Sequence, residues 1–121
     1  MKCKNKGLRH IWDACRYSLN GFRAAFRDEA AFRQICFYVL PLAIFAFLFA
    51  ESWQIRTLLL LPLVLALIVE LVNTAIESVV DLASPQWQPL AKKAKDTASA
   101  AQFCAQIFVA LVWGGYIMAK L

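Results

Sequence analysis

The sequence predicts an all-α integral membrane protein with three transmembrane helices and an N-terminal amphipathic helix at the membrane surface. Hydrophobic residues make up 61% of the 121 residues, against roughly 45–50% in an average soluble domain. Long uncharged apolar stretches also alternate with short polar ones. A single domain over residues 1–121 is expected from the length. A soluble core of this size is too small to bury so many apolar side chains, so lipid is the expected surrounding.

Residues 8–27 have the periodicity of an amphipathic helix, within a predicted surface segment 8–34. Apolar side chains recur at steps of three and four, and basic and polar side chains keep the same rhythm on another face. One apolar and one basic face are typical of a helix in the membrane interface. Packing on a soluble core is the alternative, which the following apolar segments disfavour. The apolar series is Leu8, Trp12, Cys15, Leu19, Phe22 and Phe26.

Three apolar segments follow, and the predicted spans are about 35–50, 57–82 and 98–119. The first is short for a membrane crossing unless its ends extend. Polar and aromatic residues at 51–54 separate it from the second. Pro85 and Pro89 end the second segment, because proline disfavours helix at the residue before it.

The distribution of basic residues predicts the orientation. Eight Lys or Arg residues precede the first span and three lie at 83–97, against Arg56 and Lys120 on the other side. Loops rich in Lys and Arg stay in the cytoplasm. We therefore expect a multi-pass protein whose N-terminus and second loop are cytoplasmic.

One face of the second predicted span is polar, and it is made by Glu70, Asn73, Glu77 and Asp81. At about 100° per residue the four fall within about 80° of one another. Counting about 1.5 Å per residue from Thr57, Glu77 and Asp81 lie near the cytoplasmic surface and Glu70 lies deeper. A charge at mid-bilayer costs roughly 2.5–3.5 kcal/mol. Because helix packing alone would not compensate for three acids on one face, we expect these acids to have a functional role. Pairing within an oligomer is the structural alternative.

This acidic face is a candidate Mg²⁺ and phosphate site. Carboxylate and amide oxygens are hard ligands that suit Mg²⁺ bridging phosphates, and Glu29 is expected at the same level. Lys92, Lys93 and Lys95 offer positive charge for a polyphosphate, although the positive-inside rule alone equally explains them. Asp96 is a candidate acceptor for a nucleotide or a helix cap.

The four glycines exclude the common nucleotide-binding loops. Gly7, Gly21, Gly114 and Gly115 form neither a P-loop nor a kinase glycine-rich loop. A nucleotide is therefore expected to be held by metal, carboxylates and basic residues on helices.

The sequence resembles the small prokaryotic diacylglycerol kinases over nearly its whole length. The segments are Glu-Ala-Ala-Phe-Arg-Gln (29–34), Val-Glu-Leu-Val-Asn-Thr-Ala-Ile-Glu (69–77), Val-Val-Asp (79–81), Ala-Lys-Asp (94–96) and Ser-Ala-Ala (99–101). The resemblance implies transfer of the ATP γ-phosphoryl group to 1,2-diacylglycerol, giving phosphatidic acid, with Mg²⁺ as cofactor. It also implies a homotrimer in the bacterial inner membrane with composite sites between subunits. No nucleic-acid partner is expected.

The resemblance implies a role for each matching residue. Glu70 matches the general base that takes the proton of the lipid hydroxyl, and Glu29 and Glu77 match the metal ligands. The nucleotide-binding positions are Tyr17, Glu29, Asn73, Glu77, Lys95 and Asp96. The substrate-binding positions are Arg23, Glu70, Ser99 and Trp113.

Three positions depart from the family pattern. His10 stands where arginine is common, Ile35 where an acid is common, and 86–88 (Gln-Trp-Gln) where a more acidic, His-bearing triplet is common. The segments 80–85 and 89–96 lean towards undecaprenol kinase, a related branch of the superfamily. In a different class, the buried acids would serve a small proton or ion channel subunit, but residues 58–69 offer no ionisable group to continue the path. A membrane-anchored structural subunit would leave the acids without a role.

Overall fold

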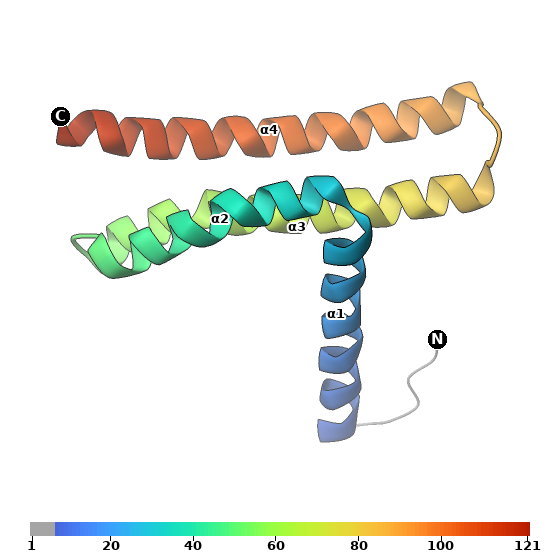
Figure 1. Cartoon of the computed structure of the whole chain (residues 1–121), viewed down its shortest axis with the longest axis horizontal. Coiled ribbons are helices and arrows are strands. Elements are labelled where there is room, and N and C mark those ends of the chain that lie inside the picture. The colour runs from blue at the N-terminus through green and yellow to red at the C-terminus, as the bar shows by residue number, and fades with distance from the viewer. Residues whose placement is uncertain (1–6) are drawn as a thin grey trace.

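The computed structural model describes residues 7–121 and folds this part of the chain into four α-helices (Figure 1). Helices α2, α3 and α4 run side by side, and α3 packs against both α2 and α4. Helix α1 points steeply away from the other three (Figure 1). The all-helical fold with an N-terminal helix set apart from three further helices is therefore confirmed. The bounds are α1 Leu8–Asp28, α2 Ala30–Phe49, α3 Trp53–Ala83 and α4 Pro89–Lys120.

Helices α2, α3 and α4 have the length and composition of membrane spans. Many of their large apolar side chains face outward, and Phe37, Leu48 and Leu111 are 74%, 66% and 70% exposed. Such a surface is unfavourable in water but is the normal surface of a helix in lipid. On α1, the predicted apolar face is likewise exposed, as expected at a membrane interface. The chain is a multi-pass membrane protein with three candidate spans.

The helix boundaries differ from the ranges that the apolar pattern outlines. The segment 8–34 is divided at Glu29, so that residues 30–34 belong to α2. Helix α3 begins at Trp53 rather than 57, and α4 begins at Pro89 rather than 98. Proline suits the first helical turn because its missing N–H needs no partner there. Hydropathy marks the apolar part of a helix, whereas the helix itself continues into the polar residues beyond.

The corner between α1 and α2 is held by Arg33. Glu29 has an extended backbone, with φ −116° and ψ 110°, and its N–H donates to Ala25 O at 2.9 Å. Arg33 Nη1 donates to Phe26 O at 2.7 Å and to Arg27 O at 2.9 Å. Carbonyl groups in the last turn of a helix lack partners within the helix. Arg33 supplies those partners from α2 and so fixes where Glu29 lies.

Arg56 has the same role at the turn between α2 and α3. Its Nε donates to Phe47 O at 3.0 Å, and its Nη2 donates to Ala50 O at 3.3 Å. The Ser52 hydroxyl accepts a hydrogen bond from Ile55 N–H at 3.2 Å and caps the start of α3. Arginine side chains therefore satisfy backbone carbonyls at the end of α1 and at the end of α2.

The core lies where α3 meets its two neighbours. Trp113 Nε1 donates to Leu59 O at 3.0 Å and links α4 to α3 across this core. The indole ring also lies 6.2 Å from the Phe45 ring and 6.3 Å from the Tyr116 ring, between centroids. The buried cluster consists of Ile35, Val39, Ala46, Leu59, Leu63, Ala66, Val109 and Trp113.

Glu51 ties the turn after α2 to the end of α4. It accepts a hydrogen bond from the Tyr116 hydroxyl at 2.5 Å and forms an ion pair with Lys120. The bonds from Lys120 and Tyr116 lower the pKa of Glu51. A carboxyl whose pKa is lower in the folded state stabilises the fold above its unfolded pKa, and this contribution disappears as pH falls through the folded pKa.

We expect Glu51→Gln to lower the thermal midpoint of the detergent-solubilised protein slightly at pH 7, because the ion pair is exposed. The difference from the unsubstituted chain should shrink below about pH 4.3, the ordinary pKa of a glutamate, and vanish once Glu51 is protonated. Thermal unfolding at a series of pH values measures this. A difference that stays constant down to acidic pH would show that the Glu51 charge is not the cause.

Candidate active site

The polar face of α3 opens onto a cleft of about 430 Å³, here called the acidic cleft. The start of α2 contributes one wall, α3 the floor and α4 the other wall. The predicted residues Glu29, Glu70, Asn73, Glu77 and Ser99 all line it, so a single subunit brings these five together. The remaining lining residues are Ala31, Gln102, Phe103 and Gln106.

Glu70 lies at the buried end of the acidic cleft and is 3% exposed. Its Oε1 accepts a hydrogen bond from Gln102 Nε2 at 2.8 Å. The same nitrogen lies 3.3 Å from Ala66 O. A buried carboxylate without a hydrogen-bond donor is costly, so Gln102 is what makes this position acceptable for an acid.

The hydrogen bonds continue from Gln102 across the bundle. Gln102 Oε1 accepts from Gln106 Nε2 at 3.2 Å, and Gln106 Oε1 accepts from the Tyr38 hydroxyl. We call Tyr38, Gln106 and Gln102 the polar chain, which ends on Glu70. It joins α2, α4 and α3 through side chains alone.

The polar chain was not predicted from the sequence. Charged side chains mark the polar face of the second span, whereas the third span has no charged residue between 98 and 119. The available signal was the pair Gln102 and Gln106, two amides one helical turn apart on an otherwise apolar helix. An amide in a span needs a hydrogen-bond partner almost as much as a charge does.

Glu77 and Asn73 form a second hydrogen-bonded unit nearer the mouth of the acidic cleft. Asn73 Nδ2 donates to Glu77 Oε1 at 2.9 Å, and both side chains are half-buried. Glu29 faces the same cleft from the corner between α1 and α2. Among residues 7–121, no three His, Cys, Asp or Glu side chains form a metal-binding group by themselves. Two carboxylates fit Mg²⁺ well, because this ion usually takes one or two protein carboxylates together with water and substrate phosphates.

Lys95 and Asp96 lie in a neighbouring cleft of about 240 Å³ formed by the connection between α3 and α4. Lys95 Nζ is 2.6 Å from Asp81 Oδ1, and Lys92 Nζ is 2.5 Å from Asp96 Oδ2. Exposed ion pairs of this kind contribute little free energy. These lysines can therefore exchange their partners for phosphate oxygens at small cost.

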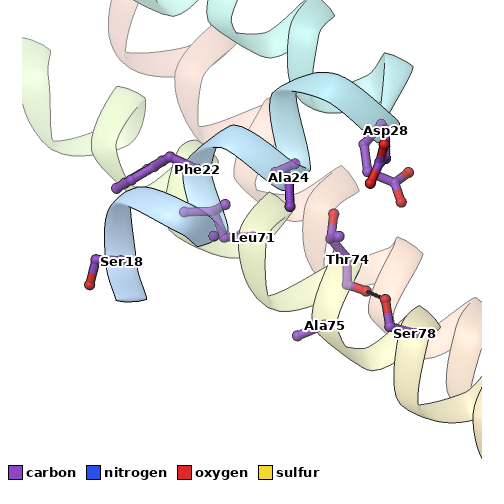
Figure 2. A pocket seen from close by; sticks show the side chains of 11 residues that line it. Ser18, Phe22, Ala24, Asp28, Leu71, Thr74, Ala75 and Ser78 are labelled. Carbon is purple, nitrogen blue, oxygen red and sulfur yellow. Dashed lines mark hydrogen bonds between the residues drawn. The ribbon is translucent and has the colours of Figure 1, made fainter. Parts of the chain in front are cut away.

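A third cleft, of about 470 Å³, lies between α1 and α3 and shares Glu29 with the acidic cleft. Asp28 stands beside it, and the hydrogen bond from Arg27 lowers the pKa of Asp28. The cleft is otherwise lined mainly by small and apolar side chains. Figure 2 shows Ser18, Phe22, Ala24 and Asp28 of α1 on one side and Leu71, Thr74, Ala75 and Ser78 of α3 on the other.

The remaining predicted residues lie outside the acidic cleft. Tyr17 is exposed on α1, and Arg23 lines a separate groove beside Phe26 and Leu67. Trp113 is 6% exposed in the core. It follows Gln102 by eleven residues (113 − 102), which is about 16 Å along α4 at about 1.5 Å per residue.

The departures from the family pattern also have defined surroundings. Ile35 is buried in the apolar core of the bundle, where a carboxylate would need a hydrogen-bond donor. Gln86, Trp87 and Gln88 line the same cleft as Lys95. His10 lies exposed on α1.

Comparison with known proteins gives one consistent family. The family model described as prokaryotic diacylglycerol kinase matches residues 16–117. A diacylglycerol kinase of Pseudomonas aeruginosa is 47% identical over 112 residues, which cover 93% of this chain and 91% of the relative. One of Helicobacter pylori is 43% identical over 116 residues, covering 96% and 91%. One of Escherichia coli K12 is 39% identical over 107 residues, covering 88% of each chain.

The position of Trp113 yields a test of its role. Trp113→Phe removes the bond to Leu59 O and part of the core volume, so we expect a loss of about 1–2 kcal/mol in the free energy of unfolding. The KM for lipid should stay unchanged. Chemical denaturation and steady-state kinetics measure the two effects. A several-fold rise in that KM without a loss of stability would instead identify Trp113 as a substrate contact.

Proposed function

The chain belongs to the prokaryotic diacylglycerol kinase family and is an ATP-dependent diacylglycerol kinase. For this reaction, we propose that Glu70 is the general base. The observation that carries the proposal is the place of Glu70. It is the most buried acid of the acidic cleft, and Gln102 holds one of its oxygens. A base at the deep end of a cleft is suited to a hydroxyl group that belongs to a membrane lipid.

The proposed reaction is a direct in-line phosphoryl transfer. The oxygen of the lipid hydroxyl attacks the γ-phosphorus of ATP and forms the new oxygen–phosphorus bond. The bond from the γ-phosphorus to the β–γ bridging oxygen breaks, and ADP leaves with that electron pair. Glu70 accepts the proton of the hydroxyl, so phosphatidic acid is released as the phosphate ester.

Glu29 and Glu77 are the proposed ligands of Mg²⁺. When bound, the ion neutralises charge on the β- and γ-phosphates during transfer. Asn73 holds Glu77 Oε1, and Arg33 fixes the corner that carries Glu29. The Glu77 carboxylate is therefore oriented by a neighbouring side chain, and the backbone that carries Glu29 is held by Arg33.

Lys95 and Asp96 are proposed on the nucleotide side, together with Asn73 and Tyr17. The cleft that Lys95 and Asp96 line lies at the connection between α3 and α4, close to the mouth of the acidic cleft. Ser99 and Arg23 are proposed on the lipid side. Trp113 stays a lipid-side prediction from the resemblance; its indole group is buried against α3, and Trp113→Phe tests its role.

Two further features belong to the proposal. We place the N-terminus and the connection between α3 and α4 in the cytoplasm, where ATP is available, since eleven of the thirteen Lys and Arg residues lie there by count along the sequence. We also propose a homotrimer. Tyr17 and Arg23 lie outside the acidic cleft of their own subunit, and a neighbouring subunit would bring its own α1 to a composite site.

The base assignment predicts the effect of Glu70→Gln. The substituted amide can still accept the bond from Gln102, so the fold should persist, but it cannot take a proton. Transfer from labelled ATP to diacylglycerol in mixed micelles should fall by at least about 100-fold, while MgATP binding stays largely intact. Unchanged turnover would rule out Glu70 as the base.

The metal assignment predicts a different effect for Glu77→Gln. An amide oxygen is a weaker ligand than a carboxylate for Mg²⁺, so the Mg²⁺ concentration that gives half-maximal rate should rise by about 10-fold or more. Glu51→Gln makes the same chemical change at the opposite end of the bundle and serves as the control. If both variants keep the original Mg²⁺ dependence, Glu77 is not a ligand.

A further inference from the structure

We propose that Gln102 is a positioning residue for Glu70, and that the polar chain sets which carboxylate oxygen meets the lipid hydroxyl. This inference rests on the proposed role of Glu70 as the base. Its observations are the cross-helix bond from Gln102 to Glu70 and the bonds that hold Gln102 in turn.

The polar chain has one direction. The Tyr38 hydroxyl donates to Gln106, Gln106 donates to Gln102, and Gln102 donates to Glu70. Each amide offers a donor on one side and an acceptor on the other. Turning Gln102 over would place its oxygen against the carboxylate and its nitrogen against Gln106 Nε2. The amide is therefore locked with its donor towards Glu70, and bonds aligned in this way strengthen one another.

The bond leaves the two carboxylate oxygens of Glu70 inequivalent. Gln102 engages Oε1 at 2.8 Å, so Oε2 is the oxygen assigned to the lipid hydroxyl. Reactive groups must be held within about 0.5 Å and 10–20° of their productive geometry. Without Gln102, rotation about the last side-chain bond would present either oxygen, or neither, to the cleft.

The surroundings of Glu70 give no substitute for Gln102. The charged side chains that face the same cleft are Glu29 and Glu77, both acidic. Acids repel the Glu70 carboxylate and cannot orient it by donating a hydrogen bond when ionised. Within residues 7–121, the hydrogen bond to this carboxylate comes from Gln102 on α4.

The test is kinetic and uses Gln102→Leu in the full-length protein. An apolar residue of similar size keeps the packing at the helix interface but removes the donor of the buried Glu70 carboxylate, so the thermal midpoint of the variant is measured before its kinetics. We expect kcat to fall by about 10- to 100-fold, because a misplaced reactive group loses rate on this scale. The KM values for MgATP and diacylglycerol should stay within about twofold. Gln54→Leu, at the exposed start of α3, is the matched control and should keep the original rate.

Variants further along the polar chain should have graded effects. Gln106→Leu should lower kcat less than Gln102→Leu, and Tyr38→Phe should lower it least, because each removes support one bond further from Glu70. If Gln102→Leu does not fold in detergent, as judged by its thermal midpoint, Gln102→Met replaces it. A kcat equal to that of the original chain in the folded variant would overturn the proposal. A large rise in the lipid KM would also overturn it, since that result marks a direct substrate contact.

Combining the substitution with Glu70→Gln separates this proposal from the base assignment. If Gln102 acts through Glu70, Gln102→Leu should cause no further loss of residual rate in the Glu70→Gln background. Losses that multiply would show that Gln102 acts independently and would overturn the positioning role. If Glu70→Gln alone keeps full turnover, the proposed function fails and the positioning role fails with it.

Discussion

The hydrogen bond between Gln102 and Glu70 is the interaction on which the candidate active site depends. It makes a buried carboxylate acceptable inside an apolar bundle, and it also fixes how α4 lies against α3. The bond from Trp113 to Leu59 keeps the same antiparallel register, since the two contacts are eleven residues apart on both helices (70 − 59 and 113 − 102). The contact that holds the candidate base thus belongs to the same helix pairing that forms the core.

The position of Glu29 follows from a second constraint, the need to satisfy the end of α1. Arg33 donates to carbonyls of α1 from within α2 and turns the chain sharply at Glu29. Because of this turn, Glu29 faces the acidic cleft with Glu70 and Glu77. The corner that separates the N-terminal helix from the first span therefore also delivers a carboxylate to the cleft. Fold and proposed chemistry use the same residues here.

The sequence predicted what depends on local geometry and missed what depends on how helices pair. Glu70, Asn73 and Glu77 share one cleft because their spacing puts them on one helical face, whatever packs against it. The contact of Gln102 with Glu70 depends on the register of α4 against α3, which no local pattern encodes. The division at Glu29 depends on a side chain four residues later. The bond from Trp113 to Leu59 O depends on the same helix pairing and likewise has no local signal.

The most direct test is a structure of the protein with diacylglycerol and a non-transferable ATP analogue bound with Mg²⁺. If Glu70 is the base, the lipid hydroxyl lies within hydrogen-bond reach of its Oε2, at about 2.6–3.2 Å, while Gln102 remains on Oε1. The γ-phosphate should then lie on the far side of that hydroxyl oxygen, in line for attack. A lipid hydroxyl bonded to Glu77 or Asp81, with Glu70 turned away from the ligand, would contradict the central claim.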